Sequence, residues 1–279
     1  MLYACGCRGS ALLRGWQVVD TLQAIRVAVA DGIATITLHR PQKRNAVSLA
    51  MWRRLADVFA ELAARADVHL LILTGAGGNF CAGADISEFS RVRADAQSGR
   101  AYEAVNEAAI LALRDCCKPT IAAVSGYGVG GGCALALACD LRVGDASTRM
   151  GIPAARLGIV YGEVDCALLY RRVGLANAKR ILFSGRHFDA TECAAIGLID
   201  ILAPGTALEG AHALAGEFAD SAPLSLSGCK LVLESLASGT ATARRSELNA
   251  AIERAMVSAD YREGTRAFLE KRKAAFKGK

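Results

Sequence analysis

The sequence predicts an α/β fold that continues into a helical C-terminal region, and three observations support this. Residues 25–38 form two alternating apolar segments around an Asp31-Gly32 turn, which is typical of a β-hairpin. Two continuous apolar runs, 70–74 and 120–124, each lead through a glycine-rich loop into a helix. From about residue 207 onward only helical patterns occur. Strands that alternate with helices and then give way to helices alone indicate an α/β core with a helical appendage.

The chain divides into three expected parts. Residues 1–20 lack the long apolar core and the cleavage site of a signal peptide, so we expect a poorly ordered N-terminal extension there. Residues 21–205 hold the predicted strands and form the core. Residues 206–279 form the helical C-terminal region.

Local patterns predict the remaining elements in order. Ser48 is a good N-cap, and apolar residues recur behind it at helical spacing to about residue 66. A mainly helical stretch begins at Glu88, and Pro119 follows its end. The other strands are expected at 68–74, 141–143 and 148–151, and the other helices at 163–173, 175–184, 190–196, 208–220, 224–237, 241–257 and 260–276.

The composition indicates a protein with a large core. Hydrophobic residues make up 53% of the 279 residues, which argues against disorder, yet no apolar run is long enough to span a bilayer. We therefore expect no membrane partner, and the apolar excess suggests subunit interfaces. The net charge of +6 suits a phosphate-bearing small molecule as well as it suits nucleic acid. However, the helix behind Ser48 has no row of lysines, so we expect no nucleic-acid partner.

The ten cysteines favour a reducing compartment. Two pairs, Cys5/Cys7 and Cys116/Cys117, are too close in sequence to form ordinary disulfides, and most of the others lie in apolar runs. The sequence contains no CxxC motif, and no group of cysteines and histidines has the spacing of a zinc site. We therefore expect buried free thiols, a cytoplasmic protein and no metal site. None of the four histidines pairs in sequence with a nucleophile, so a hydrolase triad has no support.

Two glycine-rich loops are the candidate functional feature. Residues 75–86 read GAGGNFCAGADI, and residues 124–140 read VSGYGVGGGCALALACD. Glycines at a strand-to-helix turn let the backbone come very close to another group. The first amides of the following helix stay free and point outward, where the helix dipole favours negative charge. One amide from each loop could therefore converge on an oxygen that gains charge during a reaction.

Four motifs, in this order, resemble those of the crotonase superfamily, which is the enoyl-CoA hydratase/isomerase family. They are HRPQKRNAVS, FCAGADI, VSGYGVGGGCALALACDLRV and FLEKRKAAF, and the resemblance extends from about Thr21 to Phe276. It implies a spiral of ββα units with a helical trimerisation region, and hence a homotrimer or a dimer of trimers. It also implies an acyl-CoA thioester as the substrate. Coenzyme A is then part of the substrate, and no separate cofactor is expected.

The resemblance also assigns roles to individual residues. The backbone amides of Ala84 and Gly131 would form an oxyanion hole for the thioester carbonyl, whose oxygen becomes enolate-like during the reaction. Lys43 and Arg44 could contact the phosphates of coenzyme A or could simply be solvated charges. Phe268 could contact coenzyme A or could be a core residue. The positions that match coenzyme A contacts in the family are Arg40, Lys43, Arg44, Ala46, Ala82 and Asp85, together with Phe268 and Lys271 from a neighbouring subunit.

The sequence departs from the hydratases of this family at both of their glutamates. The position that follows the glycine turn is Ala134, and the position that follows Pro153 is Ala154. The loss of a positioned acid or base typically lowers a rate by about 10²–10⁴-fold. We therefore expect standard hydration to be poor or absent.

Two other polar groups are candidates for the chemistry. Tyr161 lies in a segment, LGIVY, that resembles methylmalonyl-CoA-decarboxylase-like members, although those members carry a histidine where this chain has Ala84. Glu163 and Asp165 open the next helix, where dehalogenase- and isomerase-like members place a carboxylate. The alternative for Tyr161 is a structural role at the edge of the pocket. The alternative for Glu163 and Asp165 is a favourable interaction with the helix dipole at the N-terminus of their helix.

The functional hypotheses follow from these residues. The first is a lyase or isomerase of the crotonase superfamily that acts on an acyl-CoA, with degraded hydratase chemistry or with decarboxylase-like or isomerase chemistry. The catalytic candidates are then Ala84, Gly131, Tyr161 and Glu163. The second is an acyl-CoA binding protein that has lost its chemistry.

Overall fold

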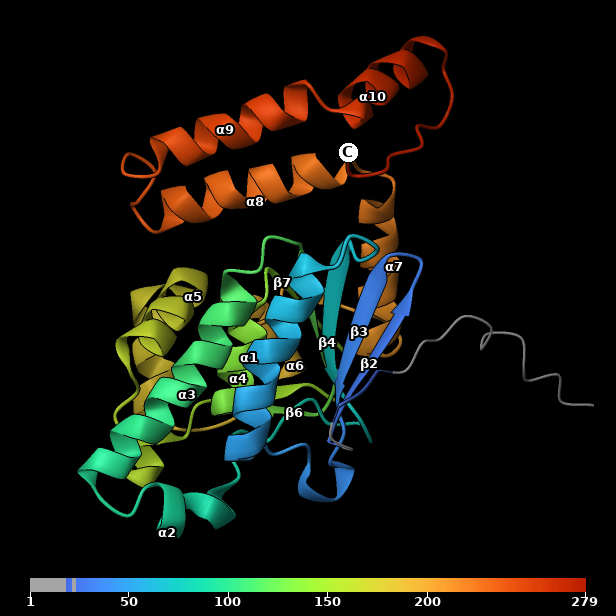
Figure 1. Ribbon diagram of the computed structural model, residues 1–279. Helices are drawn as coiled ribbons and strands as arrows, with labels where there is room; N and C mark the ends of the chain where they lie inside the picture. The colour runs from blue at the N-terminus through green and yellow to red at the C-terminus, as the bar shows by residue number, and fades with distance from the viewer. Residues whose placement is uncertain (1–18, 22–23) are drawn as a thin grey trace, which may run out of the picture.

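The computed structural model describes residues 19–21 and 24–279 (Figure 1). Residues 1–18 lie outside the described residues, so the predicted N-terminal extension stays a prediction there. Strand β1 (Val19–Thr21) pairs antiparallel with β2 (Ile25–Ala30), so the sheet already begins before residue 21. The predicted α/β core and helical C-terminal region are confirmed.

The core is built on a seven-stranded sheet with the spatial order β1-β2-β3-β4-β5-β7-β10. The first three strands are antiparallel, and the pairings from β3 to β10 are parallel. The further strands of this sheet are β3 (Ile33–Leu38), β4 (Leu70–Gly75), β5 (Thr120–Val124), β7 (Leu141–Gly144) and β10 (Ile201–Leu202). A small second sheet consists of β6 (Tyr127–Val129), β8 (Arg149–Gly151) and β9 (Phe188–Asp189).

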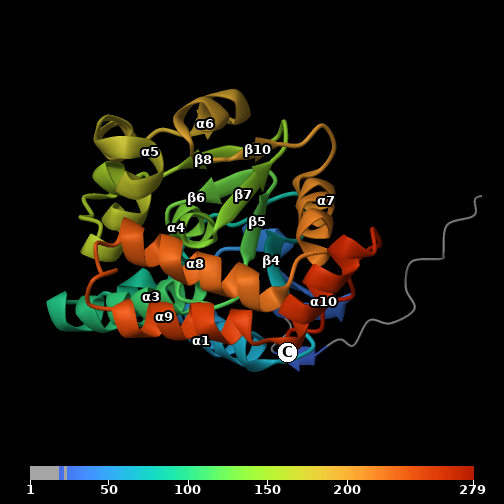
Figure 2. The same cartoon turned by 90° about the horizontal axis from the view of Figure 1, so that it is seen from above.

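Ten α-helices occur in the described residues (Figures 1 and 2). They are α1 (Leu49–Ala64), α2 (Phe89–Val92), α3 (Ala96–Arg114), α4 (Gly131–Ala138), α5 (Glu163–Ser184), α6 (Ala190–Ile196), α7 (Ala207–Ala219), α8 (Pro223–Ala237), α9 (Arg245–Met256) and α10 (Ala259–Leu269). Three short 3₁₀ turns lie at Pro41–Lys43, Ile86–Glu88 and Ala154–Leu157. None of the described helices has the length and apolar character that a membrane crossing requires.

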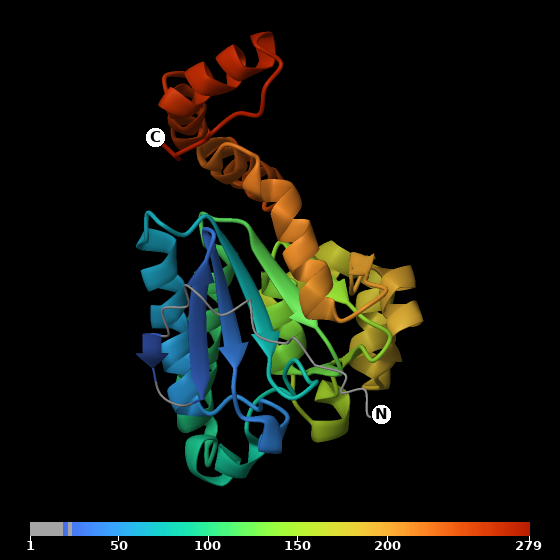
Figure 3. The ribbon, with the colours of Figure 1, turned by 90° about the vertical axis from the view of Figure 1, so that its right-hand side faces the viewer.

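The main sheet separates two apolar layers. Strand β4 shows this alternation, because Leu71 and Leu73 pack into the larger core with α1, α3 and α4, whereas Leu70 and Ile72 pack against α7. Both faces of the parallel strands are therefore covered, which explains why β4 and β5 are continuous apolar runs. Helices α8, α9 and α10 extend beyond one end of this core (Figure 3).

Several elements differ from the expectation for local reasons. The strands β6, β9 and β10 have only two or three residues, too few to show an alternating pattern. The stretch that begins at Glu88 is divided at Asp95, whose carboxylate caps α3. The C-terminal helix ends at Leu269 because the tail folds back, and the amides of Lys277 and Gly278 donate to the Asp260 carboxylate at 2.7 Å each.

The eight cysteines that the structure describes are all free thiols. Five of them, Cys81, Cys116, Cys133, Cys139 and Cys193, are buried in the core. Burial raises the pKa of the Cys81 thiol to about 12, so this side chain acts as a small apolar group. The described residues contain no group of three or more His, Cys, Asp or Glu side chains that could hold a metal ion.

The two glycine-rich loops pack against each other through backbone atoms. The Cys81 amide donates to the Tyr127 carbonyl at 2.7 Å, and the Val129 amide donates to the Cys81 carbonyl at 2.9 Å. A Cβ atom on Gly132 would lie 2.2 Å from the Cys81 carbonyl oxygen. Glycine is therefore required at position 132 by the close approach of the other loop.

This contact predicts a position-specific effect of adding one methyl group. We expect Gly132→Ala to lower the free energy of unfolding by about 1–3 kcal/mol, because the backbone of the facing loop must shift. Gly216→Ala is the matched control, since Gly216 lies in α7 with no atom within 4 Å of its Cβ position. In the control, the better helix propensity of alanine should raise stability by about 0.5–1 kcal/mol. Urea unfolding of both variants checks this, and a Gly132→Ala protein as stable as wild type would contradict the described packing.

Candidate functional site

The two predicted oxyanion-hole amides lie next to each other. A short bridge to Val47 holds the first loop, because the Val47 amide donates to the Gly83 carbonyl at 2.8 Å and the Asp85 amide to the Val47 carbonyl at 2.9 Å. This pairing uses the Gly83 carbonyl and the Asp85 amide and leaves the Ala84 N–H itself with no acceptor in the described chain. Gly131 is the first residue of α4, so its amide is also free of helical bonding.

Glycine geometry explains how close the two amides come. A Cβ atom on Gly131 would lie 3.7 Å from the Ala84 nitrogen, and one on Gly83 would lie 3.3 Å from the Gly131 nitrogen. Gly83 and Gly130 both have positive φ values, 95° and 58°, which favour glycine. The structure therefore brings together two unpaired backbone donors, which is the arrangement that stabilises a developing oxyanion.

These amides face a cavity of about 90 Å³. Its walls come from both glycine loops, from α2 and α3, and from the segment that leads into α5. The lining residues are Ala82, Gly83, Ala84, Ile86, Phe89, Arg93, Glu103, Asn106, Val129, Gly130, Gly131, Pro153, Ala154, Leu157, Ile159, Val160, Tyr161, Gly162 and Asp165. Of the two alanines that the resemblance matches to hydratase glutamates, Ala154 lines this cavity, whereas Ala134 is buried in the core and is not a lining residue.

Tyr161 and Asp165 supply polar groups to this cavity. The Tyr161 hydroxyl lies 3.4 Å from the position of a Cβ on Gly130, so it is close to the start of α4. Burial and the neighbouring Asp165 raise the pKa of Tyr161, so the phenol stays protonated. Burial also raises the pKa of Asp165 to about 6, and the negative charges of Glu103 and Glu107 on α3 add to this effect.

Glu163 is placed differently from Asp165. It is the first residue of α5, is exposed, and is not among the residues that line the cavity. Asp165 follows two residues later, is half-buried and does line it. Residues two apart on a helix point in different directions, which is why the two acids at this helix end have separate surroundings. The predicted catalytic role of Glu163 stays a prediction, but the carboxylate that the structure brings to the cavity is that of Asp165.

The residues predicted to bind coenzyme A from the first part of the chain lie together beside the first glycine loop. Arg40 and Lys43 both contact the Asp85 carboxylate at 2.9 Å. Burial alone would favour the neutral acid, but hydrogen bonds from Ser87, Lys43 and Arg40 outweigh it and hold the pKa of Asp85 well below its usual range. Asp85 therefore holds the two cationic side chains, Arg40 and Lys43, in place beside the loop.

Three further predicted contacts belong to the same region. The Arg44 guanidinium lies 5.0 Å from the centroid of the Tyr127 ring. The Ala46 carbonyl accepts a hydrogen bond from Arg40 at 2.7 Å, and the Ala82 amide donates to the Arg44 carbonyl at 2.9 Å. The loop after the hairpin and the first glycine loop are thus joined by backbone bonds at the edge of the cavity.

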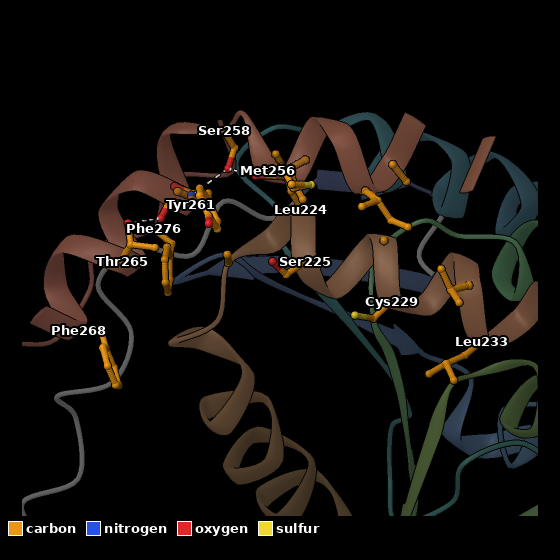
Figure 4. A pocket seen from close by; sticks show the side chains of 18 of the residues that line it. Leu224, Ser225, Cys229, Leu233, Met256, Ser258, Tyr261, Thr265, Phe268 and Phe276 are labelled. Atoms are coloured by element: carbon orange, nitrogen blue, oxygen red, sulfur yellow. Dashed lines mark hydrogen bonds between the residues drawn. The ribbon is translucent and has the colours of Figure 1, made fainter. Parts of the chain in front are cut away.

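Phe268 and Lys271 lie elsewhere, at the end of α10. Phe268 is 83% exposed and lines a cavity of about 940 Å³ between α8, α9 and α10 (Figure 4). Leu233 and Met256 line the same cavity, and most of its other walls are apolar. It has no residue in common with the cavity at the glycine loops, so the chain itself does not bring these two residues to that site.

Sequence reasoning missed two polar residues in the wall of the smaller cavity. Asn106 is buried and its Oδ1 has no hydrogen-bond partner, and the same is true of Nε of Arg93. A signal for Asn106 was present, because it occupies a position on the buried stripe of α3 between Tyr102 and Ile110. An uncharged polar residue on an apolar stripe indicates a polar partner in the folded protein.

Comparisons with known proteins show which family this chain resembles in sequence. A protein-family model described as Enoyl-CoA hydratase/isomerase matches residues 28–279. The short-chain-enoyl-CoA hydratase of Clostridium acetobutylicum is 32% identical over 249 residues, which cover 86% of this chain and 92% of that protein. The 2,3-dehydroadipyl-CoA hydratase of Escherichia coli is 34% identical over 254 residues, which cover 88% of this chain and 96% of that protein.

Solved structures show the same similarity. The crystal structure of an enoyl-CoA hydratase/carnithine racemase from Magnetospirillum magneticum superposes with a TM-score of 0.87 at 36% identity, covering 93% of this chain and 97% of that one. The enoyl-CoA hydratase of Mycobacterium tuberculosis superposes with a TM-score of 0.79 at 34% identity, covering 92% of this chain and all of that one.

Proposed function

Because this chain belongs to the enoyl-CoA hydratase/isomerase family, we propose that it binds an acyl-CoA thioester with the carbonyl oxygen between the amides of Ala84 and Gly131. Loss of a proton from the carbon next to the thioester moves negative charge onto that oxygen. Two fixed N–H donors stabilise this charge without having to reorient, and the loss of one such donor typically costs about 2.7–4 kcal/mol. The unpaired state of both amides in the described chain supports this role.

The reaction that we propose is the migration of a carbon–carbon double bond in an enoyl-CoA. One observation carries this choice. A single half-buried carboxylate, Asp165, lines the cavity, while alanine occupies both positions where hydratases of the family hold a glutamate. Hydration requires a positioned water as well as proton transfer to carbon, whereas double-bond migration needs only one group that accepts and returns a proton.

The steps follow from the position of this carboxylate. Ionised Asp165 accepts a proton from C2 of a 3-enoyl thioester, and the electron pair of the C–H bond forms a dienolate whose oxygen lies in the oxyanion hole. Protonated Asp165 then returns the proton to C4, and the carbon–carbon double bond, which was between C3 and C4, now lies between C2 and C3. A pKa of about 6 suits both steps, because the carboxyl is ionised at neutral pH yet gives its proton back readily.

Decarboxylation is the weaker alternative at this site. A carboxylated acyl group would bring a further negative charge to a wall that already holds the Asp165 carboxylate, and the positive charge of Arg93 there is already paired with Glu103. Like charges in a partly buried cavity repel strongly, so a neutral acyl group is favoured. Tyr161, whose protonated hydroxyl lies close to the start of α4, then has a positioning role toward the thioester.

We expect Asp165→Asn to lower kcat for the conversion of trans-3-hexenoyl-CoA to the 2-enoyl product by about 10²–10⁴-fold, because the proton acceptor is lost. Glu163→Gln, which removes a carboxylate from the same helical turn but outside the cavity, should change kcat little. In the wild type, kcat/KM should rise as the pH increases through about 6 and then level off, since the base must be ionised. The absorbance of the conjugated product measures all three.

Other outcomes of this assay separate the hypotheses. A larger loss in Glu163→Gln than in Asp165→Asn would contradict the assignment of the base. Brisk hydration of crotonyl-CoA by the wild type would contradict the choice of reaction. Calorimetric binding of butyryl-CoA without turnover of any enoyl-CoA would indicate a binding protein that has lost its chemistry.

The coenzyme A portion is proposed to lie along the loop after the first hairpin. Arg40 and Lys43 share one carboxylate, that of Asp85, so the cluster keeps an excess of positive charge for phosphate groups. Arg44 and Ala46 belong to the same loop, and the Arg44 carbonyl accepts a hydrogen bond from Ala82, which lines the cavity. Arg40 and Lys43 are held by Asp85 before any ligand arrives, which lowers the cost of ordering them on binding.

We also propose that copies of this chain assemble as a homotrimer, alone or as a dimer of trimers, through α8, α9 and α10. These helices expose a group of large apolar side chains, which is typical of a subunit interface. They are Leu233, Leu236, Ile252, Met256, Val257, Tyr261, Phe268 and Leu269. In such an assembly Phe268 and Lys271 of one copy would reach the coenzyme A site of another, as the family resemblance implies.

The assembly predicts a change in molar mass when charge is placed on this surface. The double variant Leu233→Glu/Met256→Glu should be monomeric in light scattering coupled to gel filtration, because buried unpaired carboxylates oppose association. Phe183→Glu, at an equally exposed apolar residue on α5, is the control and should keep the mass of at least a trimer. A wild type that runs as a monomer would contradict the proposed assembly.

A further inference from the structure

The mouth of the small cavity carries an apolar segment that the described chain leaves uncovered. Residues 157–160 read LGIV, and the three apolar side chains of this segment line the cavity. Leu157 is 50% exposed and Val160 is 94% exposed, so each meets solvent as well as the cavity. Single exposed apolar residues are common on protein surfaces, but neighbouring ones at the mouth of a cavity indicate a binding surface.

The local backbone fixes this segment at the mouth. Leu157 ends the 3₁₀ turn that begins at Ala154, and Gly158 follows with a φ of 67°, a value that favours glycine. The Ile159 amide then donates to the Ala154 carbonyl at 3.0 Å. Because this bond returns the chain toward Ala154, both Ile159 and Val160 line the cavity.

The segment is separate from the surfaces to which other roles are proposed. Coenzyme A is proposed to lie beside Asp85, and the next residue, Ile86, borders the cavity there. Residues 157–160 come from another part of the chain, between Pro153 and α5. Helices α8, α9 and α10 lie at the end of the core opposite to α2, which forms part of the cavity wall (Figures 1 and 3). Within one chain, these helices therefore leave the segment open.

The cavity is too small to enclose a long acyl group. Its volume is about 90 Å³. An engineered cavity of about 150 Å³ takes one benzene molecule, so the present cavity has room for about four non-hydrogen atoms. The thioester carbonyl and the first carbons of the acyl group fill this space. Further carbons must leave through the mouth, and the side of the mouth that coenzyme A does not occupy is the apolar segment.

The charges of the lining favour an uncharged acyl tail. Arg93 is the one cationic residue among those that line the cavity, and it is already paired with Glu103. Asp165 adds a carboxylate that is ionised at neutral pH. A carboxylate at the end of the acyl chain would find no unpaired cation in this lining, whereas an alkyl tail would remove apolar surface of the segment from water.

We propose that the acyl group of the substrate is a medium-chain alkyl group, whose tail leaves the cavity and lies against Leu157, Ile159 and Val160. These three residues then determine specificity for chain length and take no part in proton transfer. The inference rests on the proposed function, in that the thioester must lie beside Ala84 and Gly131.

The test compares calorimetric binding of butyryl-CoA, octanoyl-CoA and octanedioyl-CoA, none of which has a carbon–carbon double bond to react. Octanedioyl-CoA has the length of octanoyl-CoA but ends in a carboxylate. Because a fully buried methylene raises affinity about fourfold and a half-covered one about twofold, the wild type should bind octanoyl-CoA about tenfold to twentyfold more tightly than butyryl-CoA. Octanedioyl-CoA should lose most of this gain.

Variants at exposed positions locate the effect. The double variant Leu157→Asn/Val160→Asn should reduce the gain of octanoyl-CoA over butyryl-CoA to about threefold or less, because the tail loses its apolar contacts. Its affinity for butyryl-CoA should stay unchanged, since that acyl group lies inside the cavity. Leu175→Asn is the matched control at a similarly exposed leucine on α5, outside the cavity lining, and should keep the full gain.

Each other result counts against the inference. Equal affinity of the wild type for butyryl-CoA and octanoyl-CoA would overturn it and leave the proposed function intact, and would mean that something else, such as another copy of this chain, covers the segment. A gain that survives in the double variant, or that octanedioyl-CoA shares in full, would show that the tail lies elsewhere. Failure of all three thioesters to bind would instead overturn the acyl-CoA function on which the inference rests.

Discussion

The close packing of two glycine-rich loops is the constraint on which the rest of the site depends. Cys81 of the first loop pairs through its backbone with Tyr127 and Val129 of the second, and this contact tolerates no side chain at position 132. The same contact holds the Ala84 amide beside that of Gly131. Because both donors belong to the backbone, the thioester-oxygen site that we propose does not depend on which side chains surround it. Acid and base groups could therefore change while such an oxygen site remains.

The family resemblance predicts such a change at two alanines. Ala154, at one of the positions matched to a hydratase glutamate, lines the cavity, and Ala134, at the other, is buried in the core. The acid that remains, Asp165, comes from α5, and burial together with Glu103 and Glu107 brings its pKa close to neutrality. Asp165 is therefore the group in this cavity to which we assign the proton transfer.

Much of the fold follows from local sequence patterns, and the site follows only in part. The hairpin, the continuous strands β4 and β5 and the cap at Ser48 are predictable because alternation, apolar runs and N-caps are local signals. The glycine loops also lead to the prediction of Ala84 and Gly131, whose unpaired amides the structure brings together. The distinction between Glu163 and Asp165 is not local, since it depends on the orientation in which α5 packs against α4. The partners of Asn106 likewise depend on packing between distant segments.

The measurement that tests the account most directly is the infrared C=O stretching frequency of a ¹³C-labelled butyryl-CoA thioester, free in water and bound to the protein. Two aligned amide donors polarise the carbonyl more strongly than water does, so the account predicts a lower frequency in the bound state. A frequency equal to or higher than that in water would mean that the carbonyl oxygen lies in an apolar environment. That result would contradict the central claim that Ala84 and Gly131 bind it.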